Sequence, residues 1–91
     1  MLNYSISDKE YEDGCFQGIF QIMNPHIQEV EMYTFVFDKE INSLELVRRI
    51  IPAWNSPLHD AEMSEYIVEH YYEIKEIIER AFIEELWTLY G

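Results

Sequence analysis

The chain has 91 residues, 48% of them hydrophobic, and its 18 acidic against 6 basic side chains give a formal net charge of −12. This apolar content argues against intrinsic disorder, and the length suits one core, so residues 1–91 are interpreted as a single domain. The charge disfavours nucleic acid and anionic membranes as direct ligands and favours a basic protein surface as partner.

The first predicted element is a helix that begins at Ser7, because Ser7 and Glu10 have the spacing of a capping box. Apolar residues then follow at steps of four along this helix: Tyr11, Cys15, Ile19 and Met23. Gly14 and Gly18 would weaken the helix by about 1 kcal/mol each relative to alanine. Either another backbone approaches closely at these glycines, or they are simply tolerated there.

The next segment is ambiguous. Residues 30–37 are rich in β-branched and aromatic side chains, as strands are, and residues 2–6 alternate in a way that offers a partner strand. A two-stranded sheet is marginal by itself, however, and Asn24-Pro25 is a good helix opening. A helix over residues 26–41 is therefore preferred, followed by a short helix that Asn42 caps.

The last third has a helical pattern from about Pro57 to Leu89, and its apolar face comprises Met63, Ile67, Tyr71, Ile74, Ile78, Phe82 and Leu89. A straight helix of this length would span about 50 Å, against a diameter of roughly 33 Å for a compact chain. It must therefore kink or project beyond the body. The predicted fold class is mainly α, with three to four helices and a long C-terminal helix. The alternative is a small α+β fold with paired strands near 2–6 and 30–37.

Five glutamates on the C-terminal helix recur at steps of three, four, four and three residues, and they are termed the acidic row: Glu62, Glu65, Glu69, Glu73 and Glu76. Neighbouring carboxylates at these spacings lie roughly 5–6 Å apart and repel one another, so the row costs stability. Such a face is ordinarily just solvated surface, and that alternative stays open. The functional interpretation is that the row imitates the phosphates of a nucleic-acid strand and enters a Lys- and Arg-lined groove.

Catalytic and metal-binding chemistry have little support in the sequence. It contains no phosphate-binding glycine loop, nucleophile elbow or His-Glu-x-x-His pair, so a non-enzymatic protein is predicted. His59, Asp60 and Glu62 are one candidate metal cluster, and His70 with Glu73 is another. Neither has the paired repeats of helical di-metal sites, so no metal and no cofactor are predicted.

The lone cysteine, Cys15, has no partner for an intrachain disulfide and is predicted to be a buried, unreactive thiol in a reducing compartment. No apolar run approaches the ~20 residues of a membrane span, and residues 1–7 lack the features of a signal peptide. A cytoplasmic location is therefore expected.

The leading functional prediction is a small acidic inhibitor that binds a basic, nucleic-acid-handling protein or nuclease by occupying its charged groove. Phage and mobile-element inhibitors of restriction and CRISPR enzymes share this size and acidity, so an anti-CRISPR type of counter-defence is the specific expectation. The alternative is an adaptor, or an antitoxin-like immunity protein, that recognises one partner by shape and apolar contacts.

Apolar residues occur on two faces near the end of the C-terminal helix, and a homodimer is predicted to form there through Phe82, Ile83, Leu86, Trp87 and Tyr90. In that arrangement the acidic rows lie on the outside, because two of them would repel at close range. Packing of these residues under the N-terminal helix is the alternative.

Overall fold

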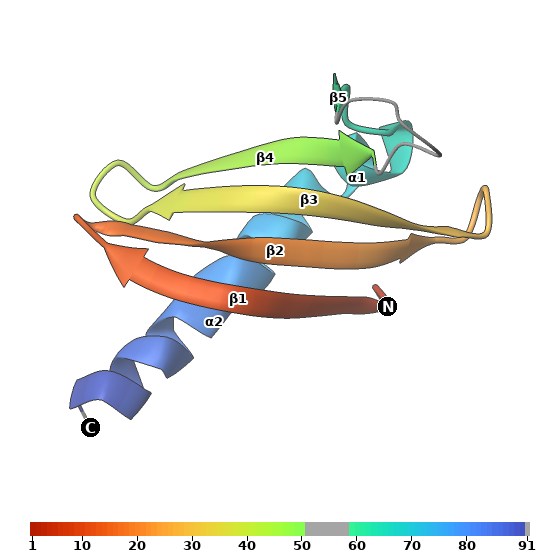
Figure 1. The fold of residues 1–91 in the computed structure, drawn as a ribbon. Helices are drawn as coiled ribbons and strands as arrows, with labels where there is room; N and C mark the ends of the chain where they lie inside the picture. Colours follow the sequence, from red (N-terminus) through yellow and green to blue (C-terminus); the bar gives the residue numbers. More distant parts are fainter. Residues whose placement is uncertain (51–58, 91) are drawn as a thin grey trace.

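The computed structural model describes residues 1–50 and 59–90, which form an antiparallel sheet with a helix across one face (Figure 1). The strands pair in sequence order: β1 (Tyr4–Glu12), β2 (Cys15–Asn24), β3 (Glu29–Asp38), β4 (Ser43–Ile50) and β5 (His59–Ala61). Two helices follow, α1 (Glu65–Glu69) and α2 (Tyr71–Tyr90). Helix α2 crosses behind the sheet, and its C-terminal end extends past β1 (Figure 1). Within the described residues, no helix has both the length and the apolarity to cross a membrane.

Both glycines of the predicted first helix belong to the β1–β2 hairpin. Asp13 and Gly14 form its two-residue turn, and their φ angles of 52° and 80° are those that a tight hairpin turn requires. Gly18 lies within β2, where a Cβ atom would stand 2.8 Å from the Ser7 carbonyl oxygen and 2.9 Å from the Phe35 ring. Glycine is therefore required at residue 18 because another backbone approaches closely, as one of the two alternatives predicted. That backbone is strand β1, and Gly18 itself lies in a strand and not in a helix.

The core lies between the sheet and the two helices. Its fully buried side chains are Phe16, Phe20, Ile22, Tyr33, Phe35 and Phe37 from the strands and Ile67, Ile74 and Ile78 from the helices. Burial of each such side chain contributes on the order of 1.5–3 kcal/mol. The predicted apolar face of the C-terminal helix is thus correct at Ile67, Ile74 and Ile78, whereas Met63 is exposed.

The prediction of a mainly α fold is wrong. The segment predicted as the first helix, residues 7–23, forms most of β1 and β2 with their turn, and residues 26–41 contain β3. The short helix expected after Asn42 is instead β4.

The physical reason is that a step of four residues is two periods of a strand as well as about one turn of a helix. Cys15, Ile19 and Met23 therefore share one face of β2, while Phe16 and Phe20 share the other and are buried against the helices. Their spacing is compatible with both structures, and strand pairing decides between them.

The α+β alternative is closer to the structure. Residues 30–37 lie inside β3, and residues 4–6 belong to β1, but these two strands do not pair because β2 lies between them. The helix expected over 57–89 begins only at Glu65, after β5, and residues 57 and 58 lie outside the described part of the chain.

Candidate functional site

The acidic row lies on the outer side of the helical segment. Glu62 precedes α1, Glu65 and Glu69 belong to α1, and Glu73 and Glu76 belong to α2. All five side chains are exposed, whereas the buried isoleucines of the same helices face the sheet. The row therefore faces solvent.

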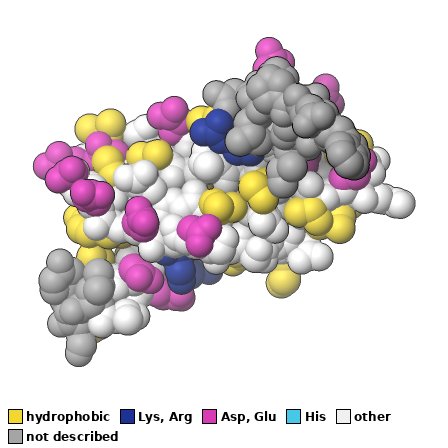
Figure 2. Space-filling view, in the orientation of Figure 1, with side chains coloured by type: hydrophobic (Ala, Val, Ile, Leu, Met, Phe, Trp, Pro, Cys, Tyr) yellow, Lys and Arg dark blue, Asp and Glu magenta, His cyan; other side chains and the backbone are white. Residues whose placement is uncertain are grey.

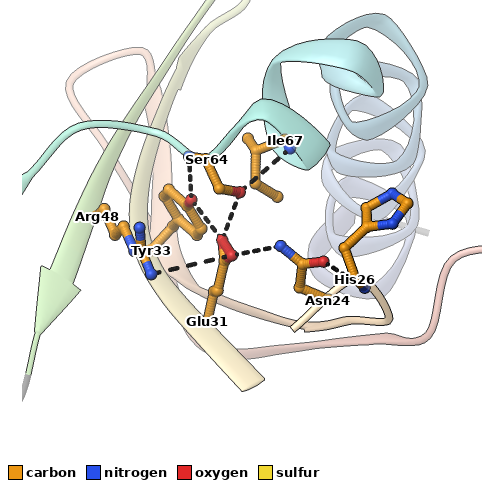
Figure 3. A network of polar contacts seen from close by, with 7 residues as sticks. All are labelled: Asn24, His26, Glu31, Tyr33, Arg48, Ser64 and Ile67. Atoms are coloured by element: carbon orange, nitrogen blue, oxygen red, sulfur yellow. Dashed lines mark hydrogen bonds and ion pairs between the residues drawn. The ribbon is translucent and has the colours of Figure 1, made fainter. Parts of the chain in front are cut away.

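The row was predicted to lie along one face of a single helix that kinks or projects, but in the structure it is divided between two helices. His70 adopts φ −104° and ψ 15°, outside the α-helical region, and separates α1 from α2. Figure 3 shows the two helices running in different directions. The row consequently bends between Glu69 and Glu73.

One lysine of β1 and one of the β3–β4 turn pair with other acidic residues of α2. The Lys9 Nζ atom of β1 lies 3.8 Å from Glu85 Oε2, and Lys39 Nζ lies 3.6 Å from Glu79 Oε1. Both pairs are partly exposed, so each contributes at most about 1 kcal/mol. These cations neutralise parts of α2 that are near the sheet.

The acidic row has no such compensation. In the part of the chain that the structure describes, none of its carboxylates forms an ion pair with a lysine or arginine. Glu73 Oε2 lies 3.2 Å from His70 Nδ1, and this pair attracts electrostatically only when His70 is protonated. Lys75, which follows Glu73 by two residues, does not pair with the row either. Within the described residues, the charge of the row is therefore not offset by a paired lysine or arginine.

A buried polar network stands beside the start of α1 (Figure 3). Glu31 of β3 is 3% exposed, and its carboxylate accepts hydrogen bonds from Asn24 Nδ2 at 2.9 Å, Tyr33 Oη at 2.9 Å and Ser64 Oγ at 2.7 Å. Arg48 Nη2 of β4 lies 4.0 Å from the same carboxylate. Glu31 thus joins three strands to the residue that precedes α1.

Ser64 is held from two sides. It is the N-cap of α1, where its Oγ atom accepts a hydrogen bond of 3.4 Å from the Ile67 amide. Its own amide donates to Tyr33 Oη at 3.3 Å. Because Ser64 fixes where α1 begins, the network also positions Glu65 and Glu69.

The network favours a charged carboxylate. Burial raises the pKa of Glu31, but the hydrogen bonds from Asn24, Ser64 and Tyr33 and the positive charge of Arg48 outweigh it, so the pKa lies below its ordinary value. Burial raises the pKa of Tyr33, and its hydrogen bond to the Glu31 carboxylate acts in the same direction. Near neutral pH the pair is therefore a carboxylate and a neutral phenol.

No role for Glu31 or Ser64 was predicted from the sequence. A signal was available, because strand alternation places Glu31 on the same face as Tyr33, Phe35 and Phe37 and so puts a carboxylate on the buried side. Because a helix was preferred for residues 26–41, the strand alternation that points to Glu31 was not applied.

The candidates for metal binding stay incomplete. Among the side chains that the structure describes, no three of His, Cys, Asp or Glu gather closely enough to hold a metal ion. The side chains of His59 and Asp60 lie outside the described residues, so their grouping with Glu62 is not addressed. Cys15 is half-buried on β2 rather than fully buried as predicted.

The predicted C-terminal interface is divided by the fold. Phe82 is only 3% exposed, and its ring centroid lies 5.6 Å from that of Phe16 and 5.9 Å from that of Phe37. Leu86 is half-buried against the same core. Phe82 thus packs in the core, in agreement with its place on the predicted apolar face of the helix, and its part in a dimer interface stays a prediction.

Two other members of that interface are exposed. Trp87 is 71% exposed and Ile83 is 41% exposed, near the end of α2 that extends past the sheet. The side chain of Tyr90 lies outside the described residues.

No family model, curated protein or solved structure matches the chain. Function is therefore inferred from the residues and geometry above.

Proposed function

We propose that the chain is a small acidic, non-enzymatic inhibitor that binds a basic, nucleic-acid-handling protein through the acidic row, in place of nucleic acid. The observation that carries this proposal is the uncompensated exposure of all five row carboxylates in a chain of net charge −12. A groove lined with lysine and arginine offers the complementary charge. Release of counterions from such a groove would favour association, as it does for nucleic acid.

The distribution of cations in the fold supports the same proposal. Lys9, Lys39 and Arg48 pair with carboxylates at or near the sheet, and the row is left charged although mutual repulsion costs stability. A basic partner would relieve this repulsion. Small size and acidity are shared with phage and mobile-element inhibitors, so we place the inhibitor in counter-defence of the anti-CRISPR type, acting in the cytoplasm of a host cell.

The test distinguishes the effect of where the acidic residues lie from the effect of the net charge of the chain. The partner is first captured on the immobilised chain from a host lysate, and its affinity is then measured over a range of salt concentrations. One variant replaces four row residues by glutamine: Glu65, Glu69, Glu73 and Glu76. A matched control replaces four exposed acids of the sheet and its turns: Glu10, Glu12, Glu29 and Glu40. Both variants change the net charge by the same amount.

We expect the row variant to bind far more weakly and to lose roughly three to four units of the slope of log affinity against log salt. The control should keep most of its affinity and slope. Duplex DNA or RNA should displace the partner, because both ligands use one groove. Affinity that is unchanged between about 50 and about 500 mM salt, or equal losses in the two variants, would exclude the proposal.

A second candidate function rests on a different observation, the exposure of Trp87. An aromatic side chain that is 71% exposed on a projecting helix end is typical of an interface anchor. An adaptor or antitoxin-like immunity protein that recognises its partner by apolar contacts would lose binding on Trp87→Ala. It would be insensitive to changes in the acidic row.

A further inference from the structure

Strand β1 forms one outer edge of the sheet, because in the described part of the chain it pairs with β2 only (Figure 1). The amide of Met23 donates a hydrogen bond of 2.9 Å to the Asn3 carbonyl oxygen, and in an antiparallel pair such bonds involve every second residue of each strand. The alternate residues, Tyr4 and Ile6, therefore direct their N–H and C=O groups away from the sheet. A protein partner that satisfies these groups has to be an extended strand.

The edge of β1 can accept a strand along part of its length. The register shifts between Ser7 and Glu10, and Asp8 has a φ angle of 52°, which together identify a β-bulge. Bulges and charged side chains protect an edge from further pairing, and in β1 both begin at Asp8. Residues 3–7 carry no charged side chain and are termed the edge segment. The N-terminal half of β1 also lies away from the projecting end of α2 (Figure 1).

The two sides of the edge segment differ in polarity. Tyr4 and Ile6 lie on the side of the helices, where they line a groove of about 210 Å³ together with Ile77 and Ala81 of α2. Tyr4 is 43% exposed there. The groove is smaller than the roughly 300–1,000 Å³ of small-molecule sites, so it suits side chains of an added strand. The side chains on the other side of the segment are polar: Asn3, Ser5 and Ser7.

We propose that the edge segment pairs with the same segment of a second copy of this chain, antiparallel and about a two-fold axis at Ser5. In this register the outward groups of Tyr4 face those of Ile6 in the second copy, and the axis repeats this pair on the other side of Ser5. All the outward backbone groups of Tyr4 and Ile6 are then hydrogen-bonded. The two sheets become one continuous sheet.

The side chains favour a second copy over other occupants. The register places Tyr4 and Ile6 of one copy beside Ile6 and Tyr4 of the other on the side of the groove, so apolar side chains cover one another. The groove also has charges of both signs on its border, Arg80 and Glu84, so a strongly basic or acidic strand would meet a like charge there. The edge segment is uncharged and meets none.

This pairing keeps the acidic rows of the two copies apart. Strand β1 is at one edge of the sheet, whereas β4 and β5 are at the other, beside α1 with Glu65 and Glu69 (Figure 1). The joined sheet therefore carries its α1 helices toward its two far edges, where like-charge repulsion between the copies is weakest. The proposal does not depend on the function proposed above.

Disulfide trapping tests both the pairing and its register. Ser5→Cys, made together with Cys15→Ser, places the two thiols opposite each other at the axis, where non-hydrogen-bonded residues have Cα atoms about 4.5 Å apart, within disulfide range. Ser7→Cys in the same background is the matched control, because it is equally a serine on the exposed side of β1. In the proposed register its thiols are separated by about four residues, or roughly 13 Å.

Under mild oxidation we expect the Ser5 variant to form covalent dimers at least about tenfold faster than the Ser7 variant. Equal rates, or faster dimerisation of the Ser7 variant, would overturn the proposed register and with it the proposal. Circular dichroism verifies that both variants are folded.

Sedimentation measures the association without a cross-link. An interface of this size belongs to the weak class, so we expect a dissociation constant on the order of 100 μM at about 300 mM salt, which screens the repulsion between two acidic chains. Ser5→Lys should weaken it about fivefold, because two lysines then face each other at the axis. Ser43→Lys, the same change on an exposed residue of β4, should alter it less than about twofold.

Two results of sedimentation would overturn the proposal. One is a wild type that stays monomeric at about 500 μM, which would leave the edge to a strand of another protein. The other is a dimer that Ser5→Lys leaves intact and that Trp87→Lys dissociates, which would assign the dimer to the end of α2.

Discussion

Replacing Glu31 tests whether the buried network holds α1 to the sheet. Glu31→Ala removes the acceptor of three hydrogen bonds and leaves the donor groups of Asn24, Tyr33 and Ser64 unsatisfied. Hydrogen bonds to a charged group contribute about 1.5–3 kcal/mol each but do not add fully within one network. Loss of one member of a buried charged cluster costs about 3–5 kcal/mol. We expect Glu31→Ala to lower the free energy of unfolding by about 3 kcal/mol, because the Arg48 side chain is 24% exposed and can be solvated once its partner is removed.

Glu31→Gln keeps the size of the side chain and removes only its charge. The amide oxygen still accepts hydrogen bonds, whereas the amide nitrogen faces groups that are themselves donors. We expect the free energy of unfolding to fall by about 1–2 kcal/mol. Glu29→Gln, on an exposed residue of the same strand, is the matched control and should change stability by less than about 0.5 kcal/mol.

The effect of Glu31 depends on pH in a known direction. Its pKa in the folded chain lies below the ordinary value of 4.5, so the unfolded chain binds this proton more tightly. The stability that Glu31 contributes is therefore fully present above pH 4.5 and is lost as the pH falls through the folded pKa. The difference between the wild type and Glu31→Gln should be constant near neutral pH and should shrink below pH 4.5.

Urea unfolding followed by circular dichroism measures these free energies, and hydrogen exchange at the Ile67 amide reports whether α1 frays locally. Two results would refute the reasoning. One is a cost of Glu31→Ala below about 1 kcal/mol. The other is a difference between the wild type and Glu31→Gln that does not change on acidification.

Two further pairs of substitutions address the packing. Gly18→Ala should lower the free energy of unfolding by about 1–3 kcal/mol, because its Cβ atom would stand 2.8 Å from the Ser7 carbonyl oxygen. Gly14→Ala should lower it by only about 1–2 kcal/mol, because the space there is open and only the φ angle of 80° is unfavourable. Urea unfolding measures both. Phe82→Ala should lower the free energy of unfolding by about 3–5 kcal/mol, whereas Trp87→Ala should change it by less than about 0.5 kcal/mol. Similar changes at both positions would contradict the assignment of Phe82 to the core and Trp87 to the surface.

The sequence by itself determined the buried face of the C-terminal helix. Tyr71 and Ile78 of α2 both pack in or against the core and are seven residues apart, which is close to two helical turns, but an odd spacing would put them on opposite faces of a strand. Periodicity therefore identified the helix without tertiary information. The exposure of the acidic row followed from the same period, since five carboxylates cannot share a face with the core. Asp13-Gly14 was a hairpin signal that the interpretation left unused.

Strand pairing decided between helix and strand in the first fifty residues. Steps of four, as from Phe16 to Phe20, suit both helix and strand, and a strand is favoured only when neighbouring strands pair with its backbone. In this fold β2 lies between β1 and β3, and Asp13-Gly14 is a local signal for only the first of these two pairings. The same holds for Glu31, whose partner Ser64 is 33 residues away along the chain. A buried charge is stable only where hydrogen-bond donors from distant parts of the chain surround it, so the burial of Glu31 depends on the folded structure. The bend of the acidic row at His70 is likewise visible only in the folded chain.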